Sequence, residues 1–66
     1  MREATARRKI RAMTEEAIKN GMEPAAAEAE RDLALDALAR TSPDEVWRLF
    51  RDGAYAPQPT GRRRTA

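Results

Sequence analysis

The stretch SPDEVWRLFRDG, residues 42–53, carries the clearest fold signal in this 66-residue chain. Ser42, followed by a proline and three residues later by Glu45, is typical of a capped helix start, a capping box. Gly53 favours a helix end, because glycine readily adopts the left-handed conformation found there. The stretch therefore predicts a short helix over residues 43–52. The residues expected on its buried stripe are Val46, Leu49 and Phe50.

Two more helices are predicted upstream, over residues 3–20 and 24–40. In the first, apolar residues recur at spacings of three and four, which places them on one face. These residues are Ala6, Ile10, Met13 and Ala17. Gly21 ends this helix, and Pro24 suits the first turn of the next one.

The second helix is apolar on two sides. One stripe consists of Ala26, Ala29, Leu33 and Ala37, whereas Leu35 and Leu38 point away from Leu33. A helix of this kind is expected to lie between two neighbours. Between the two sides runs an acidic column, defined as Glu28, Asp32 and Asp36. We expect the column to be solvated, to pair with first-helix cations such as Arg7, Arg8 or Arg11, or to face a basic partner.

These patterns predict an all-α fold: one small helical domain over residues 1–53 and a flexible basic tail over residues 54–66. The tail contains two prolines and almost no apolar residues. A core of this size rarely provides more than about 3–5 kcal/mol of stability. Because the chain has no cysteine for a disulfide, self-association into a homo-oligomer is expected to complete the core.

Several classes of function are not expected. The chain has no histidine and no cysteine, and its three glycines are isolated. It therefore lacks the usual general base, the thiolate nucleophile and a phosphate-binding loop. We predict no enzymatic activity, cofactor, metal site or small-molecule substrate. No apolar run approaches the ~18 residues of a membrane span, and the basic N-terminus has no apolar signal region. A cytoplasmic protein without a membrane partner is expected.

The charge is unevenly distributed although the formal net charge is only +2. Residues 1–20 carry six basic and three acidic groups, residues 21–40 carry two and five, and the chain closes on three arginines. Basic ends of this kind predict contacts with phosphate groups. Alternatively, the basic first helix packs beside the acidic second one. The predicted nucleic-acid-binding residues are Arg7, Arg8, Arg11, Arg48, Arg51, Arg62, Arg63 and Arg64.

The run VWRLFRDGAYAPQPTGRRR, residues 46–64, resembles the excisionase and AlpA-type helix-turn-helix proteins, relatives of the MerR winged helices. The matching positions are Val46, Trp47, Arg48, Leu49, Phe50, Gly53, Pro57, Gly61 and Arg62 to Arg64. With the preceding helix included, the resemblance covers residues 35–64. It implies a helix-turn-helix-like second half and a wing. It also implies sequence-specific DNA binding, in transcription regulation or prophage excision, in a bacterium or a phage.

A second functional hypothesis is a small helical protein-interaction module, such as a phage-encoded inhibitor or an antitoxin that binds and blocks a host protein. Large aromatic side chains dominate the energetics of such interfaces. The residues expected to anchor a host protein are Leu35, Leu38, Trp47, Phe50 and Tyr55.

Overall fold

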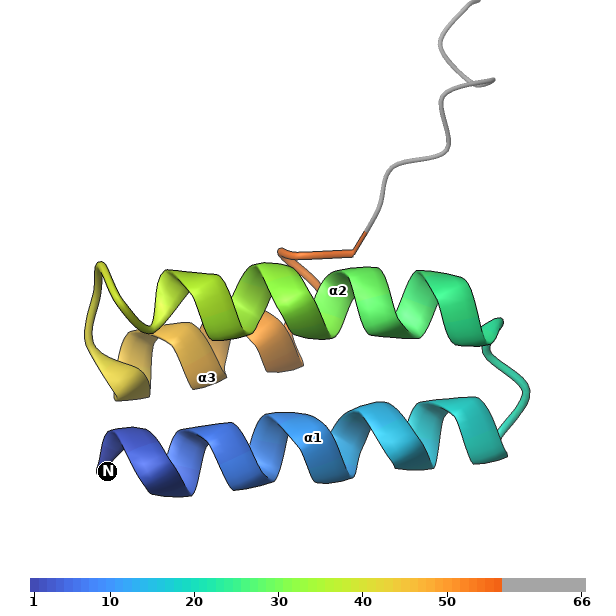
Figure 1. Ribbon diagram of the computed structural model, residues 1–66, viewed down its shortest axis with the longest axis horizontal. Helices are drawn as coiled ribbons and strands as arrows, with labels where there is room; N and C mark the ends of the chain where they lie inside the picture. Colours follow the sequence, from blue (N-terminus) through green and yellow to red (C-terminus); the bar gives the residue numbers. More distant parts are fainter. Residues whose placement is uncertain (57–66) are drawn as a thin grey trace, which may run out of the picture.

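The computed structural model describes residues 1–56, and this part of the chain is all-α, with three helices and no strand. Helix α1 spans Glu3–Lys19, α2 spans Pro24–Ala37 and α3 spans Pro43–Arg51. Figure 1 shows α2 running back alongside α1, and α3 turning again to run in the same sense as α1. Each helix packs against the other two, so the domain is a small three-helix bundle.

Helices α1 and α3 end in the same way. After α1, the N–H of Met22 donates to the carbonyl of Ala17, and the N–H of Gly21 donates to Ile18. After α3, the corresponding bonds run from Ala54 to Leu49 and from Gly53 to Phe50. These pairs of bonds define Schellman motifs, in which the residue after the cap is left-handed. Both glycines have positive φ, +108° at Gly21 and +85° at Gly53, which confirms the two predicted helix ends.

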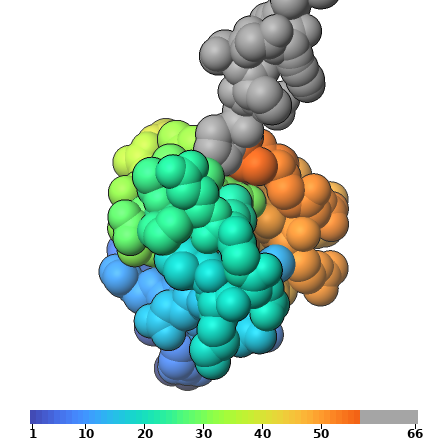
Figure 2. All heavy atoms as spheres, turned by 90° about the vertical axis from the view of Figure 1, so that its right-hand side faces the viewer, coloured from blue at the N-terminus to red at the C-terminus, as the bar shows by residue number. Residues whose placement is uncertain are grey.

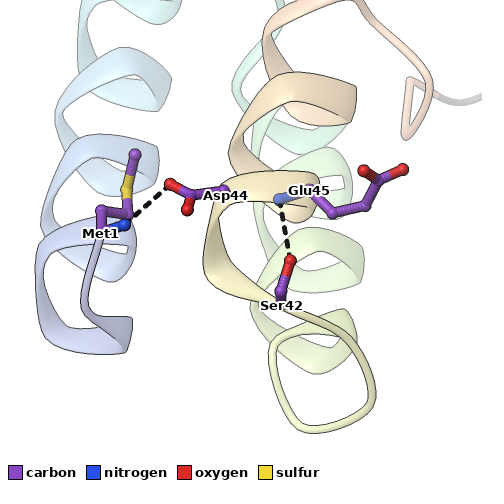
Figure 3. Close-up of polar contacts among 4 residues, drawn as sticks. All are labelled: Met1, Ser42, Asp44 and Glu45. Atoms are coloured by element: carbon purple, nitrogen blue, oxygen red, sulfur yellow. Dashed lines mark hydrogen bonds and ion pairs between the residues drawn. The ribbon is translucent and has the colours of Figure 1, made fainter.

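The predicted start of α3 is also confirmed. The Ser42 hydroxyl accepts a hydrogen bond from the Glu45 N–H at 3.2 Å, and Pro43 occupies the first helical position. Figure 3 shows this cap beside an ion pair between helix ends: the Met1 amino group lies 2.8 Å from Asp44 Oδ1. A carboxylate in the first turn also interacts favourably with the helix dipole. One part of the predicted capping box differs, because the Glu45 carboxylate binds Arg48 at 2.6 Å.

The core of the bundle contains few large side chains. Its residues are Ala6, Ile10, Ala34, Ala37, Leu38, Val46 and Phe50, with Leu35, Trp47 and Tyr55 packed against them while partly exposed. Alanine contributes three of these seven buried positions. Small side chains let helix backbones approach closely, but each buries little apolar area.

Helix α1 buries a different set of residues from the predicted one. Ala6 and Ile10 are buried as expected, but Met13 is 37% exposed, whereas Thr14 is 4% exposed. The Thr14 hydroxyl donates to the Ile10 carbonyl one turn earlier at 2.8 Å. This bond satisfies the polar group inside the apolar interface, which allows a threonine to lie where the sequence pattern favoured methionine.

Helix α2 is also rotated relative to the prediction. Its buried residues are Ala27, Ala34 and Ala37, with Leu38 buried just beyond its end. Leu33, expected on the buried stripe, is 52% exposed. The helix also ends three residues before the predicted position. The chain continues from Leu38 to Arg40 as tight turns, in which the Ala39 and Arg40 N–H groups bond three residues back.

Ordered structure extends beyond the predicted domain boundary at residue 53. The Ala56 N–H donates to the Gly53 carbonyl at 3.1 Å, and Tyr55 packs against the core. Residues 54–56 therefore belong to the folded domain rather than to a tail. The rest of the predicted tail, residues 57–66, lies outside the described residues.

Candidate nucleic-acid interface

Helix α1 presents most of the exposed positive charge of the bundle. The predicted residues Arg7, Arg8 and Arg11 are all exposed. Arg7 is engaged within its own helix, since its guanidinium donates to Glu3 at 2.7 Å. In the described part of the chain, Arg8 and Arg11 form no ion pair. These two arginines lie three residues apart, so both point to the same side of the helix.

Two more cations share this environment and were not among the predicted residues: Arg2 at the N-cap of α1, and Lys9 within the helix. Arg2 and Lys9 are exposed and form no ion pair within residues 1–56. We call Arg2, Arg8, Lys9 and Arg11, which lie toward the start of α1, the cationic half of α1; Lys19, at the other end of the helix, also forms no ion pair within residues 1–56. The excess of basic residues over the first 20 positions predicted a basic surface here. The spacing of these residues did not predict which of them form ion pairs.

The two predicted arginines of α3 differ in their contacts. Both are exposed. The Arg48 guanidinium donates to Glu45 Oε1 at 2.6 Å, and this hydrogen bond raises the pKa of Arg48. Arg51 has no ion-pair partner among the described residues.

The N-terminal end of α3 is anionic. Asp44 and Glu45 lie in its first turn. In helix-turn-helix proteins, the first residues of the recognition helix contact base edges in the major groove. Here that end carries two carboxylates, and Asp44 also binds the Met1 amino group (Figure 3). This arrangement makes the start of α3 a poor surface for a polyanion.

The acidic column of α2 lies on the outside of the bundle. Its three side chains are exposed, and the two ion pairs made there are local: Arg31 with Asp32 at 2.9 Å and Arg40 with Asp36 at 2.6 Å. Within residues 1–56, the expected pairing with cations of α1 is absent. The predicted pairing with cations of α1 is therefore wrong within the described residues, and the column is exposed to solvent there.

The residues predicted to anchor a host protein fall into two groups. Phe50 and Leu38, only 4% and 6% exposed, belong to the core and cannot serve as surface anchors in this fold. Leu35, Trp47 and Tyr55 are half-buried and pack against that core. Trp47 lies between helices: its ring centroid is 6.2 Å from that of Phe50, and Lys9 Nζ lies 5.2 Å from the Trp47 centroid.

The predicted residues Arg62, Arg63 and Arg64 lie outside the described part of the chain. Over residues 1–56, no group of histidine, cysteine or acidic side chains is arranged to hold a metal ion. None of the helices in that range is both long enough and apolar enough to cross a membrane.

Comparisons with known proteins return no relative. No family model matches the chain. No curated protein and no solved structure matches it either.

Proposed function

We propose that this protein binds nucleic acid through phosphate contacts made by the cationic half of α1. The observation that carries the proposal is that Arg2, Arg8, Lys9 and Arg11 are all exposed and have no ion-pair partner among residues 1–56. From the N-cap residue Arg2 to Arg11 they span nine residue steps, about 14 Å along the helix axis. Binding phosphates would release counterions from the nucleic acid without breaking an existing ion pair of the protein.

The distribution of charge over the other helices supports α1 as the contact surface. The outer side of α2 carries the acidic column, which repels a polyanion. The first turn of α3 carries Asp44 and Glu45. The recognition-helix arrangement implied by the resemblance would place this turn and Arg48 against DNA, although Arg48 already binds Glu45 at 2.6 Å. We therefore assign the main contacts to α1 rather than to α3.

The binding is expected to depend on charge more than on sequence. Phosphate contacts position a protein on nucleic acid but do not read the bases. In the described helices, Arg7 is the cation of α1 that a carboxylate holds in place, and Lys9 lies over the Trp47 ring; neither Arg8 nor Arg11 forms an ion pair there. We expect a regulatory or accessory role in which phosphate contacts supply the affinity.

The experiment is a titration of fluorescently labelled random-sequence duplex DNA at ~50 and ~200 mM salt. Four phosphate contacts predict a slope of log affinity against log salt near −3.6, which is a loss of about a hundredfold between these concentrations. A variant with Arg8→Gln and Arg11→Gln should reduce the magnitude of this slope by about 2.

The matched control carries Arg31→Gln and Arg40→Gln, which remove the same charge from arginines of α2 and its C-terminal turn. The control should bind almost as wild type does. Equal slopes for the two double variants would refute the assignment to α1. A chain lacking residues 57–66 measures the share contributed by Arg62 to Arg64, and Arg48→Gln with Arg51→Gln measures that of α3.

A further inference from the structure

Helix α2 has a second apolar side that nothing covers in the described part of the chain. Ala25, Ala29 and Leu33 lie four residues apart, so they form a row along one line of the helix. All three are exposed, and Leu33 has the largest exposed fraction, 52%, of the large apolar side chains at the surface. This apolar row lies directly beside the acidic column, because each of its members is three residues from an acidic one. The outer side of α2 is therefore amphipathic.

A complementary surface lies where α1 meets α3. Lys9 Nζ lies over the Trp47 ring, which places these residues at the junction of the two helices. Met13 follows Lys9 by one turn, and Arg51 follows Trp47 by one turn, in helices that run in the same sense (Figure 1). We call these four residues the α1/α3 seam. It combines an exposed methionine and a half-buried tryptophan with two cations that form no ion pair among residues 1–56.

We propose that the outer side of α2 in one copy docks onto the α1/α3 seam of a second copy. Leu33 then packs against Met13 and Trp47, and the acidic column faces Lys9 and Arg51. The amphipathic side of α2 is long enough to cover the seam: it runs from Ala25 to Asp36, about 16 Å, and the seam extends four residue steps, about 6 Å, along α1 and along α3. The docked helix supplies the second neighbour that the sequence pattern of α2 predicts.

The charges favour this pairing over a symmetric contact between two α2 helices. A symmetric contact would bring two acidic columns together, and like charges across an interface are unfavourable. Docking onto the seam brings opposite charges together. The two surfaces also lie on different sides of the bundle. Figure 2, which looks along the bundle from the α1–α2 loop, shows α3 in orange forming one side of the molecule. One copy can therefore use both surfaces, and the contact propagates from copy to copy.

The proposal goes beyond nucleic-acid binding. Lys9 belongs to both surfaces, so self-association is measured without nucleic acid. Sedimentation velocity of the full chain is measured over a range of concentrations at ~50 and ~500 mM salt, in the absence of nucleic acid. We expect the average mass of the wild type to rise with concentration without a fixed stoichiometry, and to rise less at high salt. A seam variant, Lys9→Glu with Arg51→Glu, and a column variant, Glu28→Lys with Asp32→Lys, should each remain monomeric.

Mixing the two variants gives the decisive measurement. The seam variant retains an intact α2 surface, and the column variant retains an intact seam. An equimolar mixture should therefore associate again, because the native column of the seam variant faces the native seam of the column variant, and the introduced lysines face the introduced glutamates. The control is Arg8→Glu with Lys19→Glu, which changes the net charge of the chain by the same amount at exposed positions outside the seam. It should associate as wild type does.

Three results would each overturn the proposal: a wild type that stays monomeric at low salt, a column variant that self-associates more strongly than wild type, or a mixture that contains only monomers. Far-ultraviolet circular dichroism verifies that each variant keeps its helix content. Loss of DNA binding in the Arg8 and Arg11 variant leaves the prediction for self-association unchanged, so failure of either proposal is recognised separately.

Discussion

The ammonium group of Lys9 in α1 lies 5.2 Å from the centroid of the Trp47 ring in α3. This cation–π contact joins helices that are separated by the whole of α2 in the sequence. Trp47 is also the only tryptophan in the chain, and its ring lies 6.2 Å from the core residue Phe50. Its fluorescence therefore reports directly on whether α1 and α3 are docked.

Removing the Trp47 ring should weaken the bundle measurably. Trp47→Ala is expected to cost about 2 kcal/mol, less than the ~3–5 kcal/mol of a fully buried ring, because Trp47 is only half-buried. Lys9→Gln should cost about 0.5–1 kcal/mol through the lost cation–π contact. Urea unfolding followed by circular dichroism measures both. In a Trp47→Leu background Lys9→Gln should become almost neutral, and an undiminished cost there would show that the two residues are not coupled.

The hydroxyl of Ser42 should stabilise α3 through its N-terminal cap. Ser42→Ala leaves the Glu45 N–H without its 3.2 Å acceptor and should cost about 1 kcal/mol. Ser42→Asp keeps an acceptor and should restore most of that stability. Thr41→Ala is the matched control, since Thr41 is exposed and makes no side-chain hydrogen bond within residues 1–56. Equal thermal midpoints for the alanine variants at 41 and 42 would contradict the assignment.

The left-handed conformation of Gly21 can be tested with the two mirror-image forms of alanine. Gly21 has φ of +108° and nothing within 4 Å of an added Cβ, so only the backbone conformation matters. L-alanine should cost about 1–2 kcal/mol there. D-alanine, which favours positive φ, should instead stabilise the fold by about 0.4–1 kcal/mol by restricting the unfolded chain. Chemically synthesised chains and thermal unfolding give both values, and a loss with D-alanine would contradict the prediction.

The unexpected register of α1 makes a prediction about two adjacent residues. Thr14→Gln should cost about 2 kcal/mol, because a longer polar side chain must enter a packed interface. Met13→Gln should change stability by no more than about 0.5 kcal/mol. Thr14→Val keeps the shape of the side chain and should stay within about 1 kcal/mol of wild type. Denaturant unfolding of the three variants tests whether Thr14 rather than Met13 is buried. A large loss of stability in Met13→Gln would contradict this assignment.

Partial burial of Glu30 raises the pKa of its carboxyl group by desolvation. The folded state therefore holds this proton more tightly than the unfolded state does. The stabilising contribution is fully present below the unfolded pKa and is lost as pH rises through the folded pKa. Glu30→Gln should thus raise stability at pH ~7 and have little effect at pH ~3. Unfolding free energies at the two pH values test this, with Glu28→Gln as the exposed comparison. A Glu30→Gln variant that is more stable than wild type only at pH ~3 would contradict the prediction.

The ends of the helices could be predicted because their signals are local. Ser42 and Pro43 start α3, and Gly21 and Gly53 close α1 and α3, each through bonds within a few residues. The end of α2 was predicted wrongly. No glycine follows it, and alanine and leucine at positions 37–39 are good helix formers. The turn there is imposed by the return of α3 onto the bundle.

The candidate site could be predicted only in part. The charge balance of the sequence shows that α1 is basic. It does not show that Arg7 pairs with Glu3 while Arg8 and Arg11 form no ion pair within residues 1–56, because these pairings depend on side-chain geometry. The exposed aromatics expected in an interaction module were only partly right. Phe50 lies in the core, and Trp47 lies half-buried between α1 and α3.

The sequence by itself determined that this chain forms helices and where most of them begin and end, because helix propensity and capping act within a few residues. Only the tertiary structure decided which side of each helix is buried. Alanines surround α2 on nearly every side, so its pattern barely distinguishes Ala27 and Ala34 from Ala26 and Ala29 as core positions. Which side of α2 is buried depends on how the three helices pack together to enclose Ile10, Val46 and Phe50. That packing leaves Leu33 exposed to solvent.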